Sequence, residues 1–257
     1  MSDQKTIDER HLCALLKSLF EKQLRISPND YIRYHSSDQA IASHARSFLR
    51  YREFLPESGR ILDWGCQHAP DSCMIRTSFG AKLSLVGCDF LEGLPADRYP
   101  AFWDYCRMEF VPLSDHAALP FDNNSFDCII GSGVLEHVAM DYESLKEIYR
   151  ILKSDGRLII AFLPNKFSYT EFIARNFGRF GKSGHQRLYT KSKISSMLKS
   201  TGFRPLKVQR RHLLPSNSLK SVTRMLSRYE QCIESIWPLN VFCATLLAVA
   251  QKIHTMP

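Results

Sequence analysis

The sequence predicts an α/β fold: a doubly wound, mostly parallel seven-stranded sheet preceded by an N-terminal helical cap. Short apolar runs alternate with segments of helical periodicity, which is the pattern of parallel strands joined by helices. The chain of 257 residues is long enough for one large domain with an appendage. Its composition of 44% hydrophobic and 23% charged residues is ordinary for a globular protein.

The first 56 residues are predicted to form the helical cap. Leucines recur at helical spacing between residues 7 and 25, and a Ser-Pro-Asn-Asp sequence at 27–30 ends this helix. A second helix is expected from about 38 to 54. Two roles stay open for the cap: packing against the sheet, or contact with a substrate.

The domain from 57 to 257 begins with five apolar runs, each predicted to be a strand. They are ILDWG at 61–65, LSLVGCDF at 83–90, MEFVPL at 108–113, FDCIIGSG at 126–133 and RLIIAFLP at 157–164. A helix with Asp141 as its N-cap is expected between the fourth and fifth strands.

After the fifth strand, a stretch rich in aromatic and basic residues is predicted to form an insertion at about 165–190. Its phenylalanines, Phe167 and Phe172 among them, are expected on a core-facing helix more than on a substrate platform. The expected elements of the remaining chain are a helix at 191–201, a strand at 203–209, a helix within 217–236 and a strand within 240–252.

The eight cysteines include no CxxC pair, so the sequence gives no support for a zinc site, and no metal is expected. Several cysteines lie in apolar runs and are predicted to be buried free thiols, as in a reducing cytosol. No apolar run reaches the roughly 18 residues of a membrane-spanning helix. We expect a cytoplasmic protein, with a peripheral position at the inner membrane surface as the alternative.

Charge is distributed unevenly along the chain. Residues 1–149 hold 15 Lys/Arg and 22 Asp/Glu, a net charge of −7. Residues 150–257 hold 19 Lys/Arg and only four acids, a net charge of +15. This asymmetry predicts that the second half contacts an anionic molecule.

Residues at the ends of the predicted strands are candidates for ligand binding, because ligands of open α/β sheets bind at the carboxyl ends of strands. The first strand contains Asp63 and ends at Gly65, and the second ends at Asp89, an acid placed to accept ribose hydroxyls. A dinucleotide site requires a GxGxxG turn around its pyrophosphate, and this loop has one glycine. A carboxylate at 63 suits a cationic ligand such as S-adenosylmethionine, which carries a sulfonium and no phosphate.

Four segments of this chain resemble class I S-adenosylmethionine-dependent methyltransferases, close to the large bacterial group called methyltransferase type 11. They are ILDWGC at 61–66, the acid at 89, DHAALPFDNNSFDCIIGSGVLEHV at 115–138 and IYRILKSDGRLIIAFLPN at 148–165. The resemblance is good over about 60–165 and looser to 252. It implies a Rossmann-like domain, a methyltransferase activity and S-adenosyl-L-methionine as the cofactor.

The resemblance also implies ten cofactor-binding residues: Asp63, Gly65, Cys66, Asp89, Phe90, Asp115, His116, Ser132, Gly133 and Val134. The acid at 63 and the glycine at 65 would shape the pocket for the methionine part of the cofactor. Asp89 would bind the ribose, and Phe90 would lie against the adenine ring.

Two further groups of roles follow from the same resemblance. Asp115 would hydrogen-bond the adenine amino group, with His116 beside it. Residues 132–134 would line the cofactor near its methyl group, and residues 135–137 would face the active cleft. Gln67 and Ala69 stand where the family usually has glycines, which leaves the loop geometry open and keeps a non-catalytic relative as an alternative.

The predicted reaction is methyl transfer to an oxygen or nitrogen of an anionic acceptor, such as a cell-envelope glycan or glycan precursor. His137 and His185 are the candidate general bases. The stretch HQRLYT at 185–190 resembles one in family members that act on cell-envelope sugars. The alternatives are an RNA or small-molecule methyltransferase and a nicotinamide-dependent oxidoreductase. Contact with anionic membrane or nucleic acid stays open as well.

Overall fold

The computed structural model describes residues 7–90, 93–114, 118–177, 185, 187–213 and 230–253. The chain divides into two compact units, Met1–Pro112 and Leu113–Pro257. Each unit is described by itself below.

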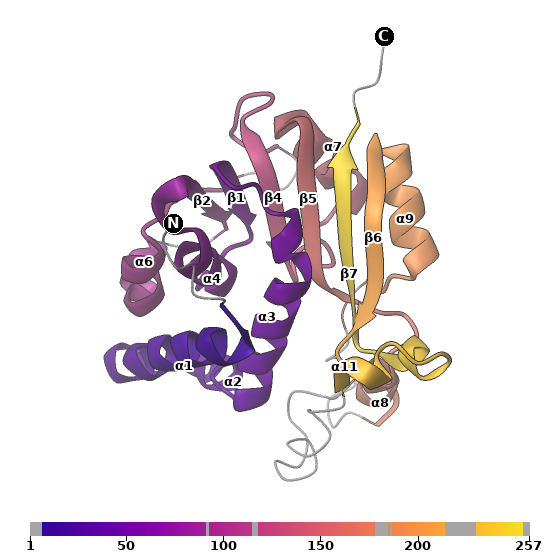
Figure 1. Ribbon diagram of the computed structural model, residues 1–257, viewed down its shortest axis with the longest axis horizontal. Coiled ribbons are helices and arrows are strands. Elements are labelled where there is room, and N and C mark those ends of the chain that lie inside the picture. The colour runs from indigo at the N-terminus through magenta and orange to yellow at the C-terminus, as the bar shows by residue number, and fades with distance from the viewer. Residues whose placement is uncertain are drawn as a thin grey trace. The chain divides into compact units, whose positions relative to one another are not determined.

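Three helices open the first unit (Figure 1): α1 (Glu9–Ile26), α2 (Asp30–His35) and α3 (Asp38–Tyr51). Each helix is capped at its start by a polar side chain that accepts a backbone N–H of the first turn. The capping residues are Asp8, Asn29 and Ser37 respectively. The sequence predicts two helices here. The third forms because Asn29, in the segment that ends α1, also caps α2.

Three parallel strands follow, in the order β3-β2-β1. They are β1 (Gly59–Trp64), β2 (Leu83–Asp89) and β3 (Glu109–Pro112). The register pairs Asp63 with Gly87, and Asp89 with Pro112. The connecting elements of this unit are the short 3-10 helices η1 (Arg52–Phe54) and η2 (Gly80–Lys82) and the helices α4 (Pro70–Phe79), α5 (Pro95–Arg98) and α6 (Pro100–Cys106).

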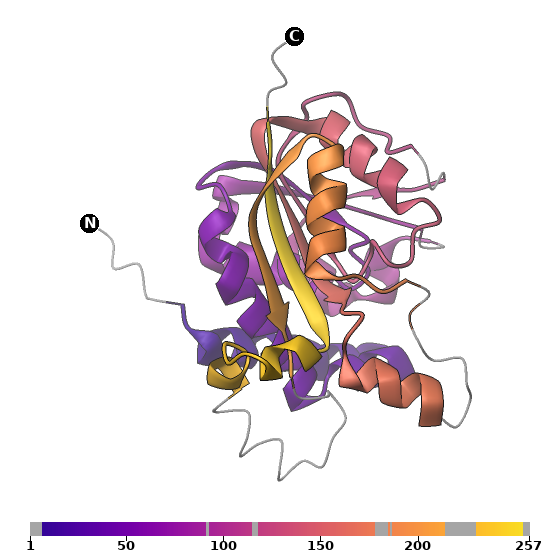
Figure 2. The ribbon, with the colours of Figure 1, turned by 90° about the vertical axis from the view of Figure 1, so that its right-hand side faces the viewer.

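The second unit holds four strands in the order β4-β5-β7-β6. They are β4 (Phe126–Ser132), β5 (Leu152–Pro164), β6 (Phe203–Arg211) and β7 (Thr245–Lys252). β4 and β5 are parallel, and β7 is antiparallel to both β5 and β6. The described helices of this unit are α7 (Asp141–Ile151), α8 (Tyr169–Phe177), α9 (Lys191–Ser200), α11 (Glu230–Ile233) and the 3-10 helix η3 (Leu239–Phe242). Figure 2 shows α9 lying along β6 and β7.

The predicted seven-stranded, mostly parallel α/β sheet is confirmed. Two details differ. Asp141 is the first residue of α7 and not its cap, because its carboxylate accepts the Tyr189 hydroxyl at 2.8 Å instead. The last strand begins at Thr245, since η3 occupies Leu239–Phe242. Of the helix expected within 217–236, residues 217–229 lie outside the described residues.

Buried apolar side chains from the strands and their covering helices form the core of each unit. Six cysteines, at 66, 73, 88, 106, 128 and 243, are buried free thiols, as predicted. Among the described residues no helix has both the length and the apolar character needed to cross a membrane.

Candidate functional site

The turn after β1 is fixed to the end of β2 by backbone hydrogen bonds. The N–H groups of Gly65 and Cys66 both donate to the carbonyl oxygen of Cys88, at 2.8 and 3.3 Å. Gly65 has a φ of +69°, a left-handed conformation that glycine adopts without steric cost. Cys66 is 3% exposed, so its side chain faces the interior of the unit and only its backbone faces the turn.

The loop retains left-handed geometry at both positions where the family usually has glycine. Gln67 has a φ of 40° and Ala69 a φ of 56°. Each costs about 1 kcal/mol, because the Cβ of an L-residue crowds the following carbonyl in this region. Both residues therefore adopt the backbone conformation that a glycine would adopt there. Ala69 then serves as the cap of α4 without a side-chain hydrogen bond, and Pro70 begins the helix.

Asp89 connects the end of β2 to this loop. Its Oδ2 accepts the N–H of Gln67 at 2.9 Å, and its Oδ1 accepts the N–H of Phe90 at 2.7 Å. Burial raises the pKa of Asp89, and these two hydrogen bonds act in the opposite direction. Each oxygen of a carboxylate has a second lone pair, so both can still accept a ligand hydroxyl. Phe90 is 40% exposed.

Asp63 lies inside the unit. It is 4% exposed, and its Oδ2 accepts the hydroxyl of Ser72 in α4 at 2.6 Å. Burial, with a further contribution from Asp71, raises the pKa of Asp63 to about 8. The carboxyl group therefore joins β1 to the start of α4 and is mostly protonated at neutral pH.

His68 was not selected from the sequence, although it lies in the same loop. Its Nδ1 lies 3.0 Å from the hydroxyl of Tyr31 in α2, and the side chain is 2% exposed. Burial lowers its pKa well below the ordinary value, so the ring is neutral. Its Nε2 has no hydrogen-bond partner among the residues that the structure describes. A single histidine in a loop gives no sequence signal for such a contact.

In the second unit, β4 ends at Ser132, and a tight turn follows. Gly133 has a φ of +66° and donates its N–H to Ala161 at 3.0 Å. Val134 accepts the N–H of His137 at 2.9 Å, which closes the next turn. The Oγ of Ser132 is buried without a partner in the described part of the chain.

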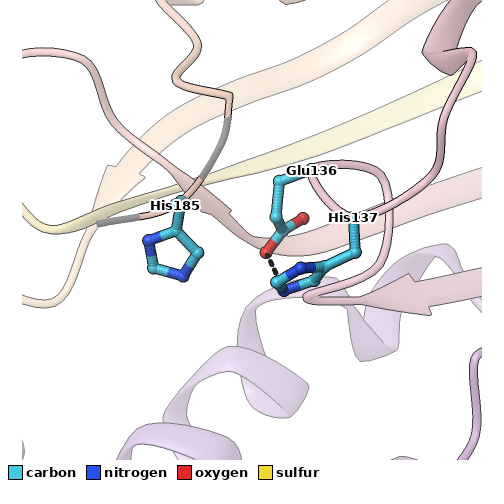
Figure 3. A group of neighbouring side chains, drawn as sticks. All are labelled: Glu136, His137 and His185. Carbon is cyan, nitrogen blue, oxygen red and sulfur yellow. Dashed lines mark ion pairs between the residues drawn. The ribbon is translucent and has the colours of Figure 1, made fainter. Parts of the chain in front are cut away.

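Glu136, His137 and His185 come together in this unit, and Figure 3 shows their side chains facing one another. One ligating atom of each lies within 4.8 Å of the other two. Oε1 of Glu136 is 3.9 Å from Nε2 of His137, and the two imidazole centroids are 5.9 Å apart. Glu136 is 2% exposed, whereas the side chain of His137 is 62% exposed.

The electrostatics of this cluster follow from burial. Burial raises the pKa of Glu136 to about 7. Burial and the neighbouring His185 lower the pKa of His137. The turn that carries Glu136 and His137 is held by Arg187, whose guanidinium donates to the carbonyl oxygens of Val138 and Ala139.

Glu171 in α8 is a second acid of this region that the sequence did not single out. Its Oε1 is 2.6 Å from Nδ1 of His185, and its Oε2 is 3.6 Å from Nε of Arg175. Arg175 also donates to the backbone oxygen of His185 at 2.6 Å. One sequence signal existed: Glu171 is one of only four acids in the basic half of the chain.

The remaining predicted site residues, Asp115 and His116, lie outside the described residues. The expectation of a core-facing aromatic helix is wrong for Phe167 and Phe172, which are 50% and 62% exposed. The described part of α8 instead buries Glu171 beside His185.

Residues 62–160 match the family model described as "Methyltransferase domain". The ubiquinone/menaquinone biosynthesis C-methyltransferase UbiE of Geotalea uraniireducens is 32% identical over 109 residues, 40% of this chain and 45% of that protein. The demethylmenaquinone methyltransferase of Clavibacter sepedonicus is 36% identical over 110 residues, 42% of this chain and 43% of that protein. The chain thus spans less than half the length of these two relatives.

Solved structures share the fold. A methyltransferase of Thermotoga maritima, described as S-adenosylmethionine-dependent and a possible histamine N-methyltransferase, has a TM-score of 0.60 at 15% identity, covering 93% of this chain and 99% of its own. Phosphoethanolamine N-methyltransferase 2 of Haemonchus contortus, solved with S-adenosyl-L-methionine, has a TM-score of 0.55 at 16% identity, covering 91% of this chain and 60% of its own.

The polar groups at the strand ends fit this cofactor. Asp89 offers carboxylate lone pairs for ribose hydroxyls, and Phe90 is exposed. Residues 62–160 therefore match a methyltransferase domain, and the chain shares the fold of S-adenosylmethionine-dependent methyltransferases, which agrees with the family and cofactor that the sequence predicts.

Proposed function

We propose that the chain transfers the methyl group of S-adenosylmethionine to an oxygen, or a nitrogen, of an anionic acceptor such as a cell-envelope glycan or glycan precursor. The observation that carries this proposal is the group formed by Glu136 and His137, which follow β4 within the matched methyltransferase domain, and by His185, which follows α8. Two imidazoles and a buried carboxyl group are suited to binding an acceptor hydroxyl and removing its proton.

The chain's own residues bind and orient the cofactor, which supplies an electrophilic methyl group. Asp89 accepts the ribose hydroxyls while its hydrogen bond from Gln67 keeps the loop in place. Phe90, which is exposed, packs against the adenine ring. Ser132, Gly133 and Val134 contact the cofactor near its methyl group. Because the reaction is an in-line displacement, positioning accounts for most of the rate enhancement.

On the acceptor side, His137 and His185 are the proposed proton acceptors. Both side chains are accessible to solvent, with 62% and 39% of their surface exposed. The Nδ1 of His185 is engaged with Glu171, which leaves its Nε2 for the acceptor. A nitrogen acceptor that is neutral at physiological pH needs no such base.

The anionic nature of the acceptor is supported by the basic second half of the chain, with 19 Lys/Arg against four acids. Not every cation there is available. Arg175 and Arg187 hold the cluster together, and the buried Arg211 is paired with Glu234. The exposed Lys166 and Lys191 are better placed to attract an anion through solvent.

The names of the relatives favour a second candidate, methyl transfer to carbon. The Geotalea protein is named a C-methyltransferase of ubiquinone/menaquinone biosynthesis, and it aligns with 40% of this chain. An acidic ring hydroxyl beside the methylated carbon would need the same proton removal by an imidazole. The position of the new methyl group in the product distinguishes the two candidates.

The test has two stages. Calorimetry with S-adenosylhomocysteine, S-adenosylmethionine and NAD is expected to give binding of the first two at micromolar affinity or better, about −8 kcal/mol. Transfer of labelled methyl is then measured against phosphate-linked glycans, quinone precursors and RNA. For a hydroxyl acceptor, His137→Ala or His185→Ala should lower turnover about 100-fold with cofactor affinity unchanged.

The exposed His11 on α1 provides the control, since His11→Ala removes an imidazole that contacts only its neighbour Asp8 among the described residues. Full turnover in both His137 and His185 variants would exclude both as the base. Tight binding of NAD without S-adenosylhomocysteine binding would overturn the proposed function itself.

A further inference from the structure

Glu136, His137 and His185 present one carboxylate and two imidazole nitrogens to a common point, with the three atoms within 4.8 Å of one another (Figure 3). We propose that these three side chains bind a divalent cation at which the acceptor oxygen is coordinated. Two imidazoles and one carboxylate are the ligands of many zinc and iron(II) sites that retain open positions. The absence of a CxxC pair argues only against a zinc site built from cysteines. It does not bear on a site built from two histidines and a glutamate.

The carboxylate of Glu136 needs a cationic partner. It is 2% exposed, its Oε2 has no hydrogen-bond partner among the described residues, and its Oε1 is 3.9 Å from His137. A buried carboxylate without a partner is costly, and either a proton or a cation relieves that cost. A cation between Glu136 and the two imidazoles would satisfy the carboxylate and be coordinated by both rings.

His185 is already oriented as a metal ligand. Its Nδ1 lies 2.6 Å from Oε1 of Glu171, so its Nε2 is the nitrogen left to coordinate. Metal-binding histidines almost always donate their other N–H to a carboxylate, carbonyl or water, which fixes the tautomer and the ring orientation. The second oxygen of Glu171, Oε2, is 3.6 Å from Nε of Arg175, an ion-pair distance longer than a hydrogen bond.

The other two ligands come from a turn that is firmly held. His137 donates its backbone N–H to Val134, and Arg187 binds the carbonyl oxygens of Val138 and Ala139. Ligand atoms about 2.0–2.2 Å from one cation lie roughly 3–3.5 Å apart. The 4.8 Å spread therefore has to contract, and the exposed ring of His137 can rotate at little cost.

This inference rests on the proposed function, because it assigns the cation to the acceptor. An acceptor hydroxyl coordinated to a divalent cation loses its proton near neutral pH, as metal-bound water does. The O–H bond breaks and the proton leaves to water. The new O–CH₃ bond forms as the S–CH₃ bond breaks, which leaves a neutral thioether. With the cation present, His137 and His185 are its ligands, and the role of proton acceptor that the proposed function gives to them passes to water.

Untagged protein is first freed of metal with a chelator and then titrated with Zn²⁺, Mn²⁺ and Co²⁺ by calorimetry, with the visible absorption of Co²⁺ reporting its coordination. One equivalent of at least one cation is expected to bind. Glu136→Gln, His137→Ala and His185→Ala should each weaken that binding at least about tenfold, and Glu171→Gln about 10–100-fold. His11→Ala and the exposed Glu143→Gln are the controls and should bind as the unaltered chain does.

Each variant is checked by its thermal unfolding midpoint, so that loss of binding is not loss of fold. Absence of binding of all three cations, or binding that survives the three ligand variants, overturns the metal site. S-adenosylhomocysteine affinity and methyl transfer are measured on the same metal-free samples. Methyl transfer that persists without metal overturns the metal inference and leaves the proposed function intact. Failure to bind S-adenosylhomocysteine with or without metal counts against the proposed function instead.

Discussion

The backbone N–H of Gln67 donates to Oδ2 of Asp89 at 2.9 Å, so the acid at the end of β2 also fixes the loop that follows β1. This contact joins two segments that are 22 residues apart in the sequence. Asp89 therefore has two tasks in the proposed function. It accepts the ribose hydroxyls, and it keeps the loop in the shape that the cofactor meets.

Replacing Asp89 with alanine removes both tasks. We expect Asp89→Ala to weaken S-adenosylhomocysteine binding by at least about 1.5 kcal/mol, because hydrogen bonds to a charged group are each worth roughly 1.5–3 kcal/mol. Calorimetry measures the change. The exposed Asp97→Ala, in α5 of the same unit, is the control and should leave the affinity unaltered. An unchanged affinity in Asp89→Ala would remove Asp89 from the cofactor site.

Asp63 predicts a dependence of stability on pH. Its pKa of about 8 in the folded chain is raised above the value near 4 of an unfolded aspartate. The folded state therefore holds a proton that the unfolded state releases, and its stabilising effect is complete below about pH 4. The free energy of unfolding should fall as the pH rises toward 8, by about 2.5 kcal/mol between pH 5 and pH 7 from this group alone.

Asp63→Asn keeps an oxygen for the Ser72 hydroxyl and removes the titrating proton. The difference in unfolding free energy between the variant and the unaltered chain should therefore grow with pH, in favour of the variant. Denaturant titrations at pH 5, 7 and 8 measure it. The exposed Asp104→Asn in α6 should show no such trend. A constant difference across these pH values would mean that Asp63 is ionised throughout.

The loop after β1 carries backbone strain that glycine would remove. Ala69 is fully buried and has a φ of 56°. Ala69→Gly gains about 1 kcal/mol by relieving the left-handed strain and loses part of it to the greater entropy of the unfolded chain. We expect a net stabilisation of up to about 1 kcal/mol with unchanged cofactor affinity. The control is Ala45→Gly in the interior of α3, which should destabilise by about that amount or more. Destabilisation by Ala69→Gly would show that the packing of the Ala69 methyl group stabilises the fold by more than the left-handed strain costs.

The sequence predicts the strands and their ends because buried parallel strands are short apolar runs that stop at glycine or acidic residues. Asp63, Gly65 and Asp89 could be located in this way. The contact between His185 and Glu171 could not, since it joins residues 14 apart through side chains with no periodic signal. The left-handed φ of Gln67 could not be predicted either, because glutamine rarely adopts this conformation. The hydrogen bond from the Gln67 N–H to Asp89 stabilises it in the folded chain.

Charge in the second unit yields the last prediction, and the structure determines which cations to change. Arg175 and Arg187 support the residues of the candidate site, so reversing their charge would damage the site itself. Lys166, Lys191 and Lys193 are exposed. Among the described contacts of their side chains is that of Lys193, whose Nζ lies 4.7 Å from the centroid of the Tyr189 ring. Lys191 and Lys193 begin α9 shortly after His185, and Lys166 follows the end of β5.

Changing these three lysines to glutamate shifts the local charge by six while leaving the cluster of Glu136, His137 and His185 in place. If the acceptor is anionic, its KM should rise about tenfold or more at low salt, with cofactor affinity and kcat nearly unchanged, because the attraction acts before the chemical step. The effect should shrink as salt screens it. The matched control is Lys146→Glu with Lys199→Glu, two exposed lysines on α7 and α9. Sedimentation with anionic and neutral vesicles, and a salt titration of RNA binding, identify which anion responds. If KM for the acceptor stays the same in the triple variant, the lysines after β5 do not recruit it, and the basic half of the chain has another partner.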